Sequence, residues 1–110
     1  MLAVFEQPGE STVLLIAERG PAEPLGCLFA TTEPDFFTGR LGAHIEVVAV
    51  TAQAEGRGIA RMLLAAGEDW ARKRRYDHVT LNVFVANARA RAVYESLGYS
   101  PETIRYRKAL

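Results

Sequence analysis

Two glycines, Gly56 and Gly58, separate an apolar stretch from a segment with helical spacing, and this pattern suits the binding of a phosphate group. Glycine adopts backbone conformations closed to other residues, so such a turn can bring N–H groups close to a ligand. The helix that follows would point its unpaired N-terminal N–H groups at the same ligand. However, the dinucleotide and P-loop motifs are not matched. On the residues alone, an ordinary tight connection between a strand and a helix explains the glycines equally well.

Glu46 is the carboxylate to which we assign chemistry, because it interrupts a nearly continuous apolar strand expected over residues 43–50. Side chains two apart on a strand share a face, so Glu46 and His44 are expected to point the same way. An acidic group in such a strand must be paired, neutralised or functional. A structural pair with His44 or with an arginine is therefore the alternative to a catalytic role.

The elements that must position these residues follow from the hydrophobic spacing. Helices are expected over about residues 58–75 and after Asn87. The strand that precedes the first helix and the strand that follows it form a strand–helix–strand unit with a crossover. The two strands before this unit form a hairpin, and residues 1–10 receive no element. Strands are expected over residues 11–18, 25–31, 43–50, 79–85 and 103–108.

Three local features refine this outline. Asn87 is expected to cap the second helix, Tyr94 to lie on its apolar stripe and Gly98 to end it. Phe36 and Phe37 lie in the loop before residue 43, where they would either line the mouth of a pocket or anchor the loop to the core. We expect the second arrangement.

Length and composition limit the class of protein. A chain of 110 residues with 49% hydrophobic and 24% charged residues is typical of one soluble globular domain, here residues 1–110. No apolar run approaches the roughly 18 residues of a membrane span, and the N-terminal residues lack the basic start of a secretory signal. The single cysteine, Cys27, agrees with a reducing compartment. We therefore expect a cytoplasmic protein with no membrane partner.

Charge is divided unequally along the chain. Residues 1–55 carry two basic and eight acidic residues, whereas residues 56–110 carry eleven basic and five acidic ones, so a net charge of zero conceals −6 and +6. An anionic ligand would be drawn to the second half and a cationic one to the first, although the charges would also suit ordinary solvated faces. Overall neutrality argues against nucleic acid as the partner.

Two blocks of the sequence resemble the GNAT superfamily of acyl-CoA-dependent N-acetyltransferases. Residues 55–60 (EGRGIA) match the glycine and the alanine of its strand–turn–helix motif, with Glu55 where the family usually has Gln or Arg. Residues 81–99 match its second block closely, and together the core motifs cover residues 43–99. The resemblance implies an α/β fold with a mixed α+β sheet, which here would lack the family's N-terminal strand and helices.

The resemblance also implies a cosubstrate, acetyl-CoA. No metal is expected, since the single cysteine cannot form a metal cluster. The backbone of the strand end would pair with the pantetheine arm and the acetyl carbonyl, and the amides of the turn would hold the pyrophosphate. Asn87 would contact the cofactor arm, and Tyr94 would lie beside the sulfur. The cofactor-binding set is Val48, Ala49, Val50, Gly56, Arg57, Gly58, Ile59, Ala60, Arg61, Asn87 and Tyr94.

The implied reaction is direct attack of a primary amine on the thioester of acetyl-CoA. An amine with a pKa near 10.4 is almost wholly protonated at pH 7, so formation of the neutral, reactive amine costs ~4 to 5 kcal/mol. Glu46 is the candidate base, acting directly or through water, and Tyr94 the candidate acid. The alternatives are a covalent route through Cys27, a non-catalytic acyl-CoA sensor, and a purely structural domain.

Several features stay open at this point. Glu55 should repel a pyrophosphate, but several N–H bonds outweigh one exposed charge, and Arg57 and Arg61 supply compensating charge. The acceptor amine is not identified, and the acidic first half favours a cationic one. An incomplete sheet end would invite pairing with a second copy as a homodimer.

Overall fold

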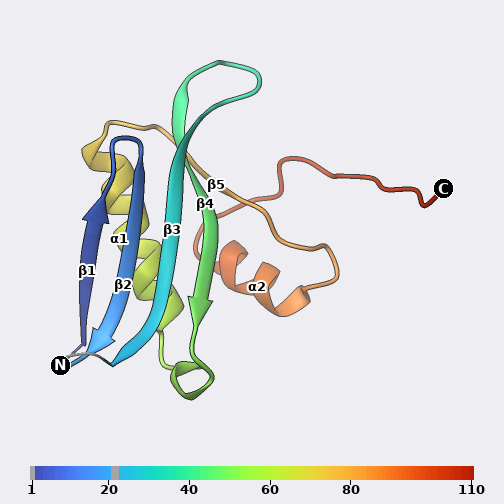
Figure 1. Ribbon diagram of the computed structural model, residues 1–110. Helices are drawn as coiled ribbons and strands as arrows, with labels where there is room; N and C mark the ends of the chain where they lie inside the picture. Colours follow the sequence, from blue (N-terminus) through green and yellow to red (C-terminus); the bar gives the residue numbers. More distant parts are fainter. Residues whose placement is uncertain (1, 21–22) are drawn as a thin grey trace.

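The computed structural model describes residues 2–20 and 23–110, and its strands form one mixed sheet in the order β1-β2-β3-β4-β5 (Figure 1). Neighbouring strands are antiparallel except for β4 and β5, which are parallel. This arrangement confirms the predicted mixed α/β fold. The strands are β1 (Leu2–Pro8), β2 (Thr12–Arg19), β3 (Pro24–Pro34), β4 (Leu41–Val50) and β5 (Val79–Leu81).

Helix α1 (Ile59–Lys73) connects β4 to β5 and covers one face of the sheet (Figure 1). A short 3-10 turn, η1 (Ala52–Ala54), stands between β4 and α1, and helix α2 (Ala88–Ser96) follows β5. The predicted strand–helix–strand unit is therefore present. Its helix is the crossover that two parallel neighbouring strands need.

The core lies between α1 and the sheet. Along β2 the buried residues alternate with partly buried ones, so that Val13, Leu15 and Ala17 face the helix. A Cβ atom at Gly67 would lie 3.3 Å from Leu28 Cδ1, which means that α1 packs tightly on β3 at this glycine. The apolar stripe predicted for α1 is confirmed by residues such as Leu63, which is fully buried.

A bulge in β4 changes which side chains face the core. Ala30 pairs with Ile45 and Phe29 with Val47, so Glu46 has no residue opposite it on β3. Before the bulge Ile45 is buried, whereas after it Val48 packs against the core and Val47 is exposed. The extra residue therefore reverses the alternation in the middle of the strand.

Three expectations about the strands are wrong. Residues 1–10 receive no element from the sequence, yet Leu2–Pro8 forms β1 and pairs with β2 along its whole length. The strand expected over residues 79–85 ends at Leu81. The strand expected over residues 103–108 is absent, because these residues lie in an exposed segment that extends away from the body in Figure 1 and pairs with no strand of the described chain. Alternation alone does not make a strand without a neighbour to pair with.

The expected anchoring of Phe36 and Phe37 is also wrong. Their side chains are 91% and 80% exposed, and the two rings contact each other edge to face with centroids 5.1 Å apart. They lie in the loop between β3 and β4, away from the core. The loop expected around residues 19–24 includes residues 21 and 22, which lie outside the described residues. Neither helix of the described chain has the length and apolar composition needed to cross a lipid bilayer.

Candidate active site

The end of β4 has one free edge. Strand β5 pairs with β4 only from Ala43 to Ile45, and beyond Leu81 the chain turns away toward α2 (Figure 1). The Thr51 N–H donates a 2.8 Å hydrogen bond to the Leu25 carbonyl on the β3 side. Backbone groups of successive strand residues point to alternate edges, so those of Val48 and Val50 point to the free edge and those of Ala49 to β3.

The turn between β4 and α1 has free space around its two glycines. Gly56 and Gly58 have φ angles of 76° and 77°, and nothing lies within 4 Å of a Cβ atom built at either position. Both therefore require glycine because of their backbone conformation. The Arg57 N–H donates to the Ala54 carbonyl at 3.4 Å. Within the described chain, no hydrogen bond is formed by the N–H groups of Gly56, Gly58, Ile59, Ala60 and Arg61.

A hollow of about 270 Å³ lies beside this turn. Its lining includes two guanidinium groups, those of Arg57 and Arg19. The sequence analysis assigns no role to Arg19, because it lies 38 positions before Arg57 and only the sheet brings the two together. Two cations beside free amides favour an anionic ligand there.

Helix α2 begins as predicted and lies next to the turn. The Asn87 side chain accepts a 3.1 Å hydrogen bond from the Ala90 N–H, so it caps the helix. At the other end of α2, Ser96 Oγ accepts a 3.2 Å bond from Arg61 Nη2. Tyr94, two residues before Ser96, is partly buried against the core. An arginine from the first turn of α1 therefore contacts the last residue of α2.

The C-terminal end of α2 is fixed by a glycine and two tyrosines. Gly98 has a φ of 97°, and the Gly98 and Tyr99 N–H groups donate to the carbonyls of Glu95 and Tyr94 in a Schellman arrangement. The Tyr99 ring contacts the Tyr94 ring edge to face, with centroids 6.1 Å apart. Burial and the neighbouring Glu68 carboxylate raise the pKa of Tyr99 above its ordinary range.

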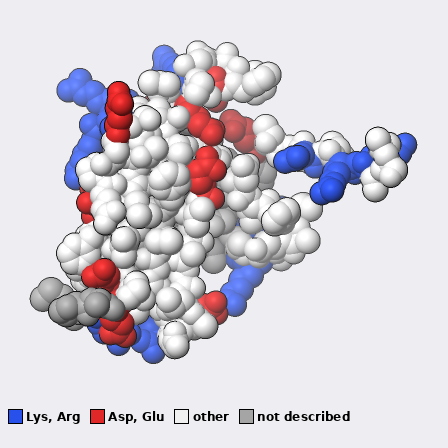
Figure 2. Space-filling model, viewed as in Figure 1, with Lys and Arg blue, Asp and Glu red and all other residues white. Residues whose placement is uncertain are grey.

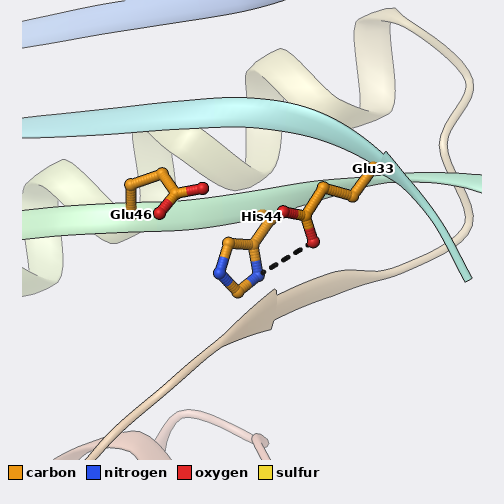
Figure 3. Close-up of side chains that lie close together, drawn as sticks. All are labelled: Glu33, His44 and Glu46. Atoms are coloured by element: carbon orange, nitrogen blue, oxygen red, sulfur yellow. Dashed lines mark ion pairs between the residues drawn. The ribbon is translucent and has the colours of Figure 1, made fainter.

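Glu46 belongs to a cluster with His44 and Glu33, whose side chains are drawn in Figure 3. One ligand atom from each lies within 4.8 Å of the others. His44 is 9% exposed, and both carboxylates are exposed. Thr31 Oγ1 donates a 3.3 Å hydrogen bond to Glu46 Oε1. The expectation that Glu46 and His44 point the same way is confirmed.

The sequence analysis assigns no role to two residues beside His44, which are Glu33 and Thr80. Glu33 Oε2 lies 3.8 Å from His44 Nδ1, and Thr80 Oγ1 lies 2.7 Å from the same nitrogen. Thr80 pairs with His44 across the parallel strands, so a correct register for β4 and β5 would have found it. No pattern in the sequence places Glu33 near His44, because the loop between β3 and β4 leaves the register of these two strands undetermined.

The cluster has ligand types that metal ions use, but its spacing is wide. Two ligand atoms on one tetrahedral zinc ion are about 3.3 Å apart, given bonds of about 2.0 Å. The side chains of Glu33, His44 and Glu46 would have to move closer together to reach that spacing. The expectation that no metal takes part therefore stays a prediction.

Acidic and basic side chains lie in different places on this face of the molecule. In the view of Figure 2, acidic side chains come into the centre of the face opposite α1, whereas basic ones lie at the rim and on the C-terminal segment. The Asp77 carboxylate is 2.6 Å from His78 Nδ1 and accepts a 2.9 Å hydrogen bond from Arg40 Nη1, and these two contacts hold the pKa of Asp77 below its usual range. The exposed carboxylates of the face favour a cationic ligand.

In this mixed sheet the parallel strands β4 and β5 separate beside the turn that holds Gly56 and Gly58. This arrangement defines the acyl-CoA N-acyltransferase class of α/β folds. Residues 2–99 match the acetyltransferase (GNAT) family, and the chain belongs to that family. The resemblance found in the sequence is thereby confirmed.

Individual proteins give the same result. A mycothiol acetyltransferase of Beutenbergia cavernae is 42% identical over 94 residues, which cover 86% of this chain and 30% of that protein. The chain thus spans less than a third of the length of this relative. A solved structure from Pyrococcus furiosus has a TM-score of 0.87 at 28% identity and covers 94% of this chain and 68% of that chain. AAC(6')-Iy, solved with the bisubstrate analogue CoA-S-monomethyl-acetylneamine, shares the fold with a TM-score of 0.76 at 21% identity, covering 93% of this chain and 72% of that one.

Proposed function

We propose that this chain transfers the acetyl group of acetyl-CoA to a primary amine by direct attack on the thioester. The observation that carries the proposal is the free edge of β4 leading directly into a turn with unpaired amides. An extended chain with amide groups pairs with such an edge, and a diphosphate suits such a turn. Membership of the acetyltransferase family supports the same reading.

The proposed cosubstrate contacts divide between the strand and the turn. Backbone groups of Val48 and Val50 pair with the pantetheine arm, and the free amides between Gly56 and Arg61 hold the pyrophosphate. Ala49 lies between the two strand contacts with its own backbone directed at β3. Asn87 already uses its side-chain oxygen as a cap, so its NH₂ group is the donor that contacts the arm.

Glu46 and Tyr94 carry the proposed chemistry. Glu46 takes a proton from the acceptor ammonium, directly or through water, because only the neutral amine has the lone pair needed for attack. Tyr94 gives a proton to the departing thiolate, which is already a fairly stable anion. Loss of Glu46 should therefore matter more than loss of Tyr94.

We further propose that the acceptor is a cationic amine. The exposed carboxylates of Glu33 and Glu46 support this, since their oxygens lie near each other on the face beside the free strand edge. Relatives of this fold include a glucosamine-6-phosphate N-acetyltransferase of Arabidopsis thaliana and an aminoglycoside acetyltransferase crystallised with sisomicin. Amines of several sizes therefore belong in the test.

The test is calorimetry with acetyl-CoA, followed by release of the free thiol with a panel of amines that includes polyamines, aminoglycosides and peptide N-termini. We expect saturable binding at one site and thiol release with at least one cationic amine. Desulfo-CoA serves as a control that binds without supplying an acetyl group.

Two results would count against the proposal. Acetyl-CoA binding with no transfer across the whole panel would favour a non-catalytic acyl-CoA sensor. No binding of acetyl-CoA would leave only a structural domain of the same fold.

A further inference from the structure

The imidazole of His44 is held in one position between two strands. It comes from the middle of β4 and is 9% exposed, although it lies beside exposed carboxylates. Its Nδ1 atom is 2.7 Å from Thr80 Oγ1 and 3.8 Å from Glu33 Oε2. Figure 3 shows the ring between the side chains of Glu33 and Glu46.

These contacts select one tautomer of the neutral ring. An ionised carboxylate only accepts hydrogen bonds, and the hydroxyl of Thr80 can accept one as well. Both groups lie on the Nδ1 side of His44. The Thr80 hydroxyl can accept from a protonated Nδ1 or donate to a bare one, so the tautomer is decided by the Glu33 carboxylate, whose charge favours the proton on Nδ1 and leaves Nε2 with a free lone pair.

We propose that His44 is a positioning residue of the acetyl transfer that receives through Nε2 the proton collected by Glu46. Glu33 favours the tautomer that can accept and stabilises the imidazolium that results, and Thr80 holds the ring in place through its contact with Nδ1. This inference rests on the proposed function, and it adds a residue to which the sequence analysis assigns only a pairing role.

A general comparison of proton acceptors explains why a histidine is useful here. A carboxylate with an ordinary pKa near 4.3 holds a proton less tightly than an imidazole with an ordinary pKa near 6.5, by about two units or a factor of about 100. An exposed carboxylate alone returns the proton readily to the amine. A neighbouring imidazole keeps it away while the amine attacks.

The proton balance of the transfer is closed. The acceptor ammonium has three N–H protons, and the amide product keeps one. One proton passes through Glu46 to His44 and then to solvent, which frees the lone pair that forms the C–N bond. The C–S bond breaks with its electron pair on sulfur, and the remaining proton reaches the thiolate by way of Tyr94.

The charged groups that face the ring come from two strands. Glu33 belongs to β3 and Glu46 to β4, whereas β5 contributes the uncharged Thr80. The two carboxylates of the cluster both favour a cation between them. A proton that reaches the ring during turnover has the Glu33 carboxylate, 3.8 Å from Nδ1, as its partner.

The first experiment needs no acetyl-CoA. Nitrogen-15 NMR of the free protein, labelled at histidine, distinguishes a ring protonated on Nδ1 from one protonated on Nε2. We expect the Nδ1–H form for His44 at neutral pH, and loss of this preference in Thr80→Val combined with Glu33→Gln. An Nε2–H ring in the unaltered protein would overturn the proposal, whatever the enzymatic result.

The second experiment separates kcat from KM. His44→Asn keeps a polar atom near the Nδ1 position, and His44→Gln keeps one near the Nε2 position, but neither side chain accepts a proton. We expect kcat to fall about 100-fold in both, with the KM values for acetyl-CoA and amine changed less than about twofold. His78→Asn is the matched control, because His78 lies outside the cluster.

Thermal melting of each variant shows whether it is folded. Folded His44→Asn and His44→Gln proteins that keep the unaltered kcat would overturn the proposal, while transfer itself stands. If the unaltered protein binds acetyl-CoA but transfers to no amine, the proposed function fails instead, and the NMR result still decides the state of His44.

Discussion

The Tyr99 hydroxyl donates a 2.8 Å hydrogen bond to Glu68 Oε2, which joins the third residue after α2 to the middle of α1. The ring of Tyr99 also contacts that of Tyr94, the proposed acid. Two hydrogen bonds therefore join α2 and the residues that cap it to α1, this one and the bond from Arg61 Nη2 to Ser96 Oγ. Helix α2 has no fully buried residue of its own, so its attachment depends on these bonds and on the partly buried Tyr94 and Leu97.

Replacing Tyr99 with Phe should lower the free energy of unfolding by about 1 kcal/mol, since the hydrogen bond to a charged group is lost from a half-buried place. Its pKa is raised in the folded state, so the contribution of Tyr99 is fully present below pH 10 and is lost as pH rises above that value. In denaturant unfolding, the difference between the two proteins should therefore be constant up to about pH 9 and should narrow as the pH rises from about 10 to about 11. A difference that stays constant with pH would contradict this explanation.

Gly58→Ala should weaken acetyl-CoA binding by about tenfold, because a shifted turn loses at least one N–H bond to a charged group. The strain of a positive φ also costs about 1 to 2 kcal/mol of stability. Gly39→Ala is the matched control: Gly39 has a φ of 72°, has nothing within 4 Å of its Cβ position and lies in the loop after β3. Calorimetry should give equal loss of stability in both variants but loss of affinity only in Gly58→Ala.

Glu46→Gln should lower kcat about 100-fold or more, with little change in the affinity for acetyl-CoA, because the amide cannot take the amine proton. Thiol release at saturating amine measures this effect. Glu6→Gln, an exposed change on β1, is the control for a lost negative charge. Normal rates in Glu46→Gln throughout the neutral pH range would remove Glu46 from the mechanism.

Tyr94→Phe should lower kcat less than Glu46→Gln and mainly at high pH, where solvent does not protonate the thiolate. The ring and its packing against Tyr99 are kept, so acetyl-CoA affinity should not change. The measurement is a pH profile of kcat. A profile of unchanged shape and height would leave Tyr94 with a packing role alone.

Glu55→Gln should strengthen acetyl-CoA binding about two- to fivefold. Glu55 is exposed at the start of the turn, and a single exposed charge near a helix end changes the free energy by ~0.3 to 1 kcal/mol. The gain should shrink as salt is added, since screening reduces the repulsion. Equal affinities at low salt would show that the Glu55 carboxylate is too far from the ligand to repel it.

Local sequence determined much of the site. The glycines of the turn, the cap at Asn87 and the stop at Gly98 are set by the backbone conformations and hydrogen bonds of a few neighbouring residues, and all are found where predicted. The apolar stripe of α1 follows from helical spacing in the same way. These features depend on contacts within one or two turns of chain, which a sequence displays directly.

Tertiary structure decided the remainder, because it depends on pairing between distant strands. The 103–108 segment has the alternation of a strand but no neighbour, whereas Leu2–Pro8 becomes a strand because β2 lies beside it. The bulge at Glu46 and the register of β4 against β3 and β5 bring Glu33 and Thr80 to His44. Single-residue alternation says which face a side chain takes, but only the packed sheet says what it meets there.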